Sequence, residues 1–241
     1  MVSLAPETIF HLGSFPVTNT LLDTIFIDAV LVALVVTINK NLKVIPGIFQ
    51  NLIELIIEMI NDITKSVATD RTKMIFPYFM SFFLFIVISN WSGLLPILTS
   101  IGFFTKEGFI PLFRSPSTDL NTTLALAIVS IIATHSMSIR TIGIVHYLRR
   151  FFSINPFYLF IGLLELISEF TKVISFSFRL FGNVFVGEVM ISQLSAITAF
   201  FLPLPLLLYE LAVGLLQAVI FGMLTMAFMS ILTTPHDADA H

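Results

Sequence analysis

Two charged side chains stand in an otherwise apolar part of the sequence, SFSFRLFGNVFVGEVM at residues 175–190. They are Arg179 and, nine positions later, Glu188. At about 100° per residue on a helix, nine positions turn a side chain by about 180°, so the two charges point in opposite directions. A guanidinium keeps its proton at any attainable pH, whereas a carboxylate can titrate. The two residues therefore indicate a fixed cation and a proton-exchanging acid on opposite faces of one helix, with separate proton paths flanking a barrier.

Other polar groups share the helix of Arg179. A sector of roughly 80° around the predicted helix holds Glu165, Glu169, Lys172, Arg179 and Asn183. Glu169 and Lys172 can pair at a spacing of three, but Arg179 is too far along the helix for either carboxylate to neutralise it. A snorkelling arginine near an interface is the alternative. Against it, Arg179 lies about twenty residues from either end of its apolar stretch.

Two further helices carry candidate polar residues. Glu210 and Gln217 are seven residues apart and share one face of the last apolar stretch, where Gln217 could also form a simple hydrogen bond between helices. Asp119 and Asn121 open an earlier helix, and Asp119 could act there as an N-terminal cap. His135 lies deeper in that helix, and both core packing and a proton-accessible site stay open for it.

The composition identifies the surroundings of these residues as a membrane. The chain has 241 residues, 56% of them hydrophobic and 11% charged, with a mean hydropathy of +0.98. Soluble domains are about 45–50% apolar and about 25% charged. There is no cysteine, which excludes disulfides and thiolate metal sites, and the net charge of −3 gives no indication of nucleic-acid binding.

The apolar runs predict an all-α integral membrane protein that forms a single membrane domain. About five membrane-embedded helices are expected, at 21–38, 75–98, 120–139, 157–201 and 206–233. Apolar residues at spacings of three and four predict an amphipathic helix at 46–67, either on the membrane surface or packed beside other helices. Residues 1–20 are expected to form an outer leader, and 234–241 a solvated tail in which His236 and His241 bind no metal.

The fourth of these expected helices, at 157–201, is unusually long. Its 45 residues would make about 67 Å of helix, more than twice the thickness of the hydrocarbon core of a bilayer. Either this stretch breaks, or it lies steeply tilted within the membrane, because an ordinary tilt of about 20° cannot absorb the excess length. We expect 157–201 and 206–233 to form a long, strongly tilted pair of helices.

The distribution of lysine and arginine among the loops predicts the orientation of the chain in the membrane. The segment before the first helix and the second loop are poor in these residues, whereas the first and third loops are rich in them. Because cytoplasmic loops carry the excess of positive charge, the N-terminus is expected outside and the C-terminus, after five crossings, in the cytoplasm.

Several motifs together resemble subunit a of the F-type rotary ATP synthases. They occur in the same order over nearly the whole chain, and the third of them, in the long helix, is highly specific. The motifs are Asn90-Trp91-Ser92-Gly93-Leu94-Leu95-Pro96, Thr118-Asp119-Leu120-Asn121-Thr122-Thr123, Arg179-Leu180-Phe181-Gly182-Asn183 with Gly187-Glu188, and Leu216-Gln217-Ala218.

The resemblance implies a static, non-catalytic subunit that translocates protons beside a rotating ring of small hairpin subunits, the c-ring. Arg179 would separate two aqueous half-channels, with Asn183 and Gln217 as its polar neighbours. Glu188 and Glu210 would line the outer channel, with Asp119 and Asn121 near its mouth, although many relatives carry a histidine at the position of Glu210. Peripheral-stalk b-type subunits would be further partners, no cofactor is implied, and the membrane would be a bacterial plasma membrane or an organellar inner or thylakoid membrane.

Other classes of membrane protein fit the sequence less well. A secondary ion-coupled transporter usually has internal repeats and broken helices around its substrate site, and the sequence has no repeat. A receptor or a purely structural membrane subunit would leave Arg179 and Glu188 unexplained, and an ion-channel subunit is a further alternative. The sequence has no phosphate-binding Gly-rich loop, so any ATP would be made by another subunit. Both H⁺ and Na⁺ stay open as the coupling ion.

Overall fold

The computed structural model describes residues 5–68, 71–105, 108–151, 156–198, 201 and 203–234. Helices dominate this part of the chain. The long ones are α1 (Asn19–Asn41), α2 (Ile48–Val67), α3 (Thr72–Ser92), α5 (Leu120–Ile142), α7 (Pro156–Ile197) and α8 (Pro203–Thr233). The shorter ones are α4 (Pro96–Thr99), α6 (Ile144–Phe151) and the 3₁₀ turn η2 (Pro116–Thr118).

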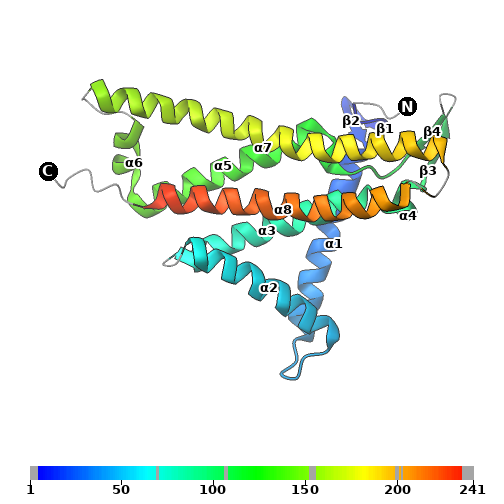
Figure 1. Ribbon diagram of the computed structural model, residues 1–241, viewed down its shortest axis with the longest axis horizontal. Helices are drawn as coiled ribbons and strands as arrows, with labels where there is room; N and C mark the ends of the chain where they lie inside the picture. Colours follow the sequence, from blue (N-terminus) through cyan, green and yellow to red (C-terminus); the bar gives the residue numbers. More distant parts are fainter. Residues whose placement is uncertain are drawn as a thin grey trace.

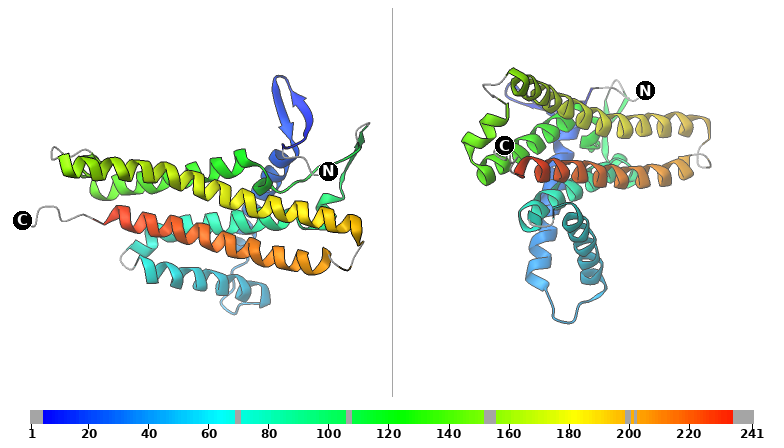
Figure 2. Two further views of the ribbon diagram at one scale, coloured as in Figure 1. Left: turned by 45° about the horizontal axis from the view of Figure 1, so that its top comes forward. Right: turned by 60° about the vertical axis from the view of Figure 1, so that its left-hand side comes forward.

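Four helices lie alongside one another, and a fifth crosses them (Figure 1). The axes of helices α3, α5, α7 and α8 are roughly aligned in the picture, with the chain running in opposite directions in consecutive ones, while α1 runs across them. In the right-hand view of Figure 2, α1 and α2 extend away from the layer that α7 and α8 form. Only the first turns of α1 are buried, so most of its length presents apolar side chains outward.

The core lies mainly between α3 and α8. Phe79 and Ile86 of α3 and Met226 and Met229 of α8 are almost completely buried. Helix α8 approaches α3 closely at Gly222, where a Cβ atom would collide with the Phe79 ring. Small residues let two helices come together in this way when lipid supplies no hydrophobic driving force between them.

The amphipathic helix α2 combines the two arrangements that the sequence left open. Its C-terminal half packs against the core through Ile60 and Thr64, both almost completely buried. Its N-terminal half leaves Ile48, Phe49 and Leu52 exposed. Exposed apolar side chains on one face are typical of a helix that also contacts lipid.

Two short hairpins and α6 were not expected from the sequence. Strands β1 (Thr8–Leu12) and β2 (Phe15–Thr18) pair antiparallel within the expected leader, and β3 (Gly102–Thr105) pairs with β4 (Gly108–Pro111). The helix expected over 75–98 is shorter, since α3 ends at Ser92 and α4 follows separately. The expected tail at 234–241 lies outside the described residues except for Thr234.

The fold class expected from the sequence is confirmed: this is an all-α integral membrane protein. In the described part of the chain α1, α3, α5 and α8 are each long and apolar enough to cross a membrane. Helix α7 is longer still, with 42 residues that correspond to about 63 Å of helix, and it carries five charged side chains. No proline interrupts it after its first residue, so it continues past both Arg179 and Glu188.

Candidate functional site

Arg179 lies on the outward face of α7. Its side chain is exposed, and its guanidinium donates a long hydrogen bond of 3.5 Å to the hydroxyl of Ser175, one turn earlier. Among the described residues no carboxylate forms an ion pair with it. A Cβ at Gly182 would meet nothing within 4 Å, and Val186 is exposed on the same face. The arginine therefore stands on an open, otherwise apolar surface.

Asn183 and Gln217 connect this part of α7 to α8. The Asn183 side-chain amide donates a 2.9 Å hydrogen bond to the Gln217 carbonyl oxygen. Gln217 is only 4% exposed, and its own amide nitrogen has no hydrogen-bond partner among the described residues. The bond holds the two helices together one turn from Arg179.

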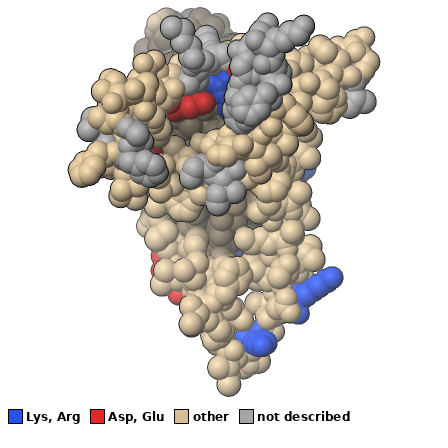
Figure 3. All heavy atoms as spheres, turned by 90° about the vertical axis from the view of Figure 1, so that its right-hand side faces the viewer, with Lys and Arg blue, Asp and Glu red and all other residues tan. Residues whose placement is uncertain are grey.

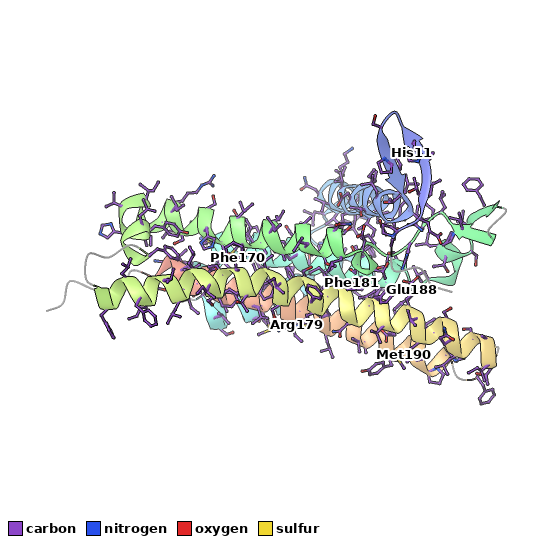
Figure 4. All side chains as sticks on the ribbon, turned by 90° about the horizontal axis from the view of Figure 1, so that it is seen from above. His11, Phe170, Arg179, Phe181, Glu188 and Met190 are labelled. Atoms are coloured by element: carbon purple, nitrogen blue, oxygen red, sulfur yellow. The ribbon has the colours of Figure 1, made fainter. Side chains whose placement is uncertain are left out.

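Glu188 points to the other side of α7, toward α1 and the N-terminal hairpin (Figure 4). There its carboxylate lies 3.3 Å from the guanidinium of Arg114, with side-chain exposures of 32% and 7% respectively. Arg114 also donates to the backbone oxygen of Ala5. In Figure 3, Asp or Glu atoms and Lys or Arg atoms are visible together in a recess on this end of the molecule.

Arg114 is the residue that sequence reasoning missed. The sequence places it in a loop, where it counted only as one positive charge toward the orientation. No local pattern relates it to Glu188, which lies 74 positions later. Its burial, 6% exposed, is a consequence of the tertiary fold.

Buried polar side chains continue from this ion pair into the interior. Ser115 donates to the backbone oxygen of Ser89, and Ser92 donates a 2.7 Å hydrogen bond to Asp23 of α1. Asp23 is fully buried, and its second carboxylate oxygen has no hydrogen-bond partner among the described residues. A polar path therefore leads from the ion pair between α1, α3 and η2.

Asp119 both caps α5 and joins this polar path. One carboxylate oxygen accepts a 2.9 Å hydrogen bond from the backbone nitrogen of Asn121, and the other accepts one of 3.2 Å from the Thr20 hydroxyl. The capping role weighed from the sequence is thus present, together with a contact to α1. The Asn121 side chain itself is exposed.

Glu210 lies on α8 directly against α7. It is 8% exposed, and its carboxyl group occupies the space where a Cβ at Gly187 would stand. Because Gly187 directly precedes Glu188, the Glu210 carboxyl group lies against the same turn of α7 that carries Glu188. Among the described residues, no hydrogen bond reaches the Glu210 carboxylate.

His135 is separate from all of these residues. It lies near the C-terminal end of α5, beside Tyr147 of α6 and Glu169 of α7. The structure thus groups Arg179 with Asn183 and Gln217, and it brings Glu210 to the turn of α7 that carries Glu188 with its partner Arg114. Asp119 contacts α1 instead, and His135 lies on the other side of Arg179. Lys172, in the same sector as Arg179 on an ideal helix, instead pairs with Glu169 and lies over the Phe228 ring.

Comparison with known proteins identifies the family. The sequence profile described as ATP synthase A chain matches residues 21–230. The chain belongs to the ATP synthase A chain family. It is 31% identical over 230 residues to "ATP synthase subunit a" of Moorella thermoacetica, covering 95% of this chain and 97% of that protein.

A second member of the ATP synthase A chain family is "ATP synthase subunit a 2" of Pelobacter propionicus. It is 32% identical over 224 residues, covering 93% of this chain and 90% of the relative. These matches extend over nearly the whole chain, and they confirm the resemblance drawn from the sequence motifs.

Proposed function

We propose that this chain is the proton-translocating stator subunit of an F-type ATP synthase. It stands beside a rotating c-ring whose small hairpin subunits each carry a membrane-embedded carboxylate, and peripheral-stalk b-type subunits hold it in place. The chain catalyses no reaction itself; ion flow through it turns the ring, and other subunits make ATP. The names of its relatives support this role.

One observation carries the proposal: Arg179 is an outward-facing cation without a counter-charge among the described residues of its own chain. A charged side chain surrounded by apolar groups within a membrane is costly and marks an ion path or a partner site. The open surface at Gly182 and Val186 leaves room for another subunit. A ring carboxylate supplies the missing negative charge.

Two half-channels meet at this arginine. Glu188 lies nine residues beyond Arg179, about 13.5 Å along the helix axis, and on the opposite face. We assign Glu188 and Glu210 to the channel that opens outside, with Asp119 and Asn121 near its mouth. Asn183 and Gln217 keep α7 and α8 together beside Arg179, and His135 belongs to the other side of the barrier.

The fixed charge then couples proton movement to rotation. A ring carboxylate stays ionised only near the guanidinium, and it must be protonated before it moves into lipid. Because arginine does not release its proton, protons cannot pass from one half-channel to the other without travelling on the ring. The membrane potential supplies about 2.3 kcal/mol per proton for each 100 mV.

Replacement of Arg179 tests the proposal. Arg179→Ala and Arg179→Lys should both abolish ATP-driven proton pumping in membrane vesicles, measured by quenching of a pH-sensitive dye. Lysine keeps a charge but lacks the planar group and can lose its proton when buried. Arg179→Ala should also raise passive proton permeability, because the barrier between the channels is lost.

The control for these variants is Ser195→Ala, which alters an exposed hydroxyl on the same helix that bonds only its own backbone. Assembly of the complex is verified by immunoblot in each case. Substantial pumping by an assembled Arg179→Ala complex would contradict the mechanism and reduce the arginine to a structural anchor.

A further inference from the structure

A second group of ionisable side chains lies where α5, α6 and α7 meet. We call Tyr147, His135, Glu169 and Lys172 the His135 cluster. The Tyr147 hydroxyl is 2.9 Å from Nδ1 of His135, and Nε2 of His135 is 3.4 Å from one carboxylate oxygen of Glu169. The other Glu169 oxygen accepts a 2.7 Å hydrogen bond from Lys172.

This arrangement allows His135 to exist with or without an extra proton. In the neutral ring, Nε2–H faces the Glu169 carboxylate while Nδ1 accepts from the Tyr147 hydroxyl. In the protonated ring, Nδ1 becomes a donor, and the hydroxyl can rotate to accept instead, because a phenolic oxygen does both. The cluster therefore offers a bonding arrangement for both protonation states, which a proton-carrying group requires.

The His135 cluster is half-buried but reachable. The side chains of His135, Glu169 and Lys172 are 19%, 12% and 18% exposed. Two adjoining depressions of about 470 and 250 Å³ are both lined by His135 and Tyr147. The larger also includes Ser136 and Arg140 and the smaller Glu169, and the rest of their lining is apolar. Water that enters them is held only at these polar groups, because an apolar wall gives it no hydrogen-bond partner.

The His135 cluster lies on the opposite side of Arg179 from Glu188 along α7. Glu169 precedes Arg179 by ten residues, about 15 Å of helix, whereas Glu188 follows it by nine. Acidic side chains with basic partners thus stand on α7 at similar distances before and after the fixed cation, Glu169 with Lys172 and Glu188 with Arg114.

We propose that the His135 cluster is the proton-exchange site of the cytoplasmic half-channel, with His135 as the proton carrier. Tyr147 and Glu169 are positioning residues that hold its ring, and Lys172 fixes the charge of Glu169. Among the side chains that the structure describes, the charged groups beside the ring are Glu169 from α7, which also binds Lys172, and Arg140 from its own helix, with the Tyr147 phenol from α6. The assignment rests on the half-channel arrangement proposed above.

The first test uses the absence of cysteine from the chain. Ser136→Cys introduces a single thiol into the larger depression, and a charged, membrane-impermeant thiol reagent is applied to one face of the vesicles at a time. The thiol should react from the cytoplasmic face only, and the reaction should block passive proton conductance of membranes stripped of the catalytic sector. Reaction from the outer face, no reaction, or reaction without a block would each overturn the proposal; the cysteine-free parent chain is the control.

The second test removes the carrier. His135→Gln should lower ATP-driven pumping by about 100-fold, the lower end of the effect of losing a positioned proton-transfer group. Tyr147→Phe keeps the imidazole, so it should pump faster than His135→Gln and with an altered pH profile. Thr171→Val, which changes a hydroxyl bonded to its own helix backbone, should pump as the parent does.

The outcome separates this proposal from the one on which it rests. If Arg179→Ala abolishes pumping while an assembled His135→Gln complex pumps at the parent rate, only the assignment of the His135 cluster is wrong. If Arg179→Ala itself still pumps, the half-channel arrangement fails and the cluster has no such role.

Discussion

At the scale of single residues, Glu188 depends on a partner that it finds far away in the chain. Arg114 is almost completely buried and faces Glu188 at 3.3 Å. A buried guanidinium without its carboxylate is costly, so the pair also contributes to the local structure. Any substitution at Glu188 therefore has to keep the shape of the side chain if its proposed role in proton transfer is to be tested.

Glu188→Gln meets this requirement. The amide keeps the size of the side chain and can still accept a hydrogen bond from Arg114, but it cannot titrate. We expect ATP-driven pumping to fall by about 100-fold while the complex stays assembled. Dye quenching in vesicles and immunoblots measure the two quantities, and pumping at the parent rate would remove Glu188 from the proton path.

Glu210→Gln is the matched comparison for this variant. Glu210 is more deeply buried than Glu188 and has no arginine partner among the described residues, so its replacement removes a titrating group without leaving a buried cation. Glu210→Gln should also lower ATP-driven pumping. Glu210→His restores a titrating group, so it should recover part of the activity that Glu210→Gln loses.

At the scale of elements, the close approach of α8 to α3 at Gly222 holds the core together. A methyl group there would collide with the ring of Phe79, which is 1% exposed and cannot move outward. Gly222→Ala should lower the stability of the subunit by about 1–3 kcal/mol, the usual cost of overpacking a core. The measurement is thermal unfolding of the complex in mild detergent.

Two variants show whether that loss has the stated cause. Gly47→Ala adds a methyl group where nothing lies within 4 Å, and it should change the melting temperature far less. Phe79→Leu combined with Gly222→Ala removes the colliding ring atoms and should recover part of the loss. Equal melting temperatures for Gly222→Ala and Gly47→Ala would show that the contact is absent.

The elements also show which features a sequence pattern can predict. Apolar spacing predicted α2, and the unbroken apolar run predicted one helix through Arg179 and Glu188, because both depend on local periodicity. The hairpins escaped prediction because each strand has only four or five residues, and a proline stands within β2.

In the candidate site too, some features follow from local helix periodicity and others only from the tertiary fold. The opposite directions of Arg179 and Glu188 follow from helix geometry alone. The partners of Glu188 and Asp23 are Arg114 and Ser92, which lie 74 and 69 positions away in sequence. No periodicity connects such distant residues, so these contacts became visible only in the folded chain.

At the scale of the whole molecule, the direction of α1 relates the polar ends of the chain to the membrane. This helix has 23 residues, about 34 Å, enough to cross the hydrocarbon core of a bilayer. The N-terminal hairpin adjoins its first residue (Figure 1). At the other end, exposed Lys40 lies in the last turn of α1 and exposed Lys43 in the turn to α2. Positive charge at that turn is typical of the cytoplasmic side.

We therefore predict an N-terminus outside and a C-terminus in the cytoplasm. Epitope tags at the two ends, probed with antibody on intact cells and on inverted vesicles, should be reached from opposite faces. Lys43→Cys in the otherwise cysteine-free chain should react with an impermeant thiol reagent only from the cytoplasmic face, since it lies one crossing after the N-terminus. Tags on the same side would mean an even number of crossings and would require α7 to enter and leave the membrane on one face. Labelling of Lys43→Cys from outside, with the tags still on opposite sides, would instead reverse the whole orientation and exchange the sides assigned to Glu188 and His135.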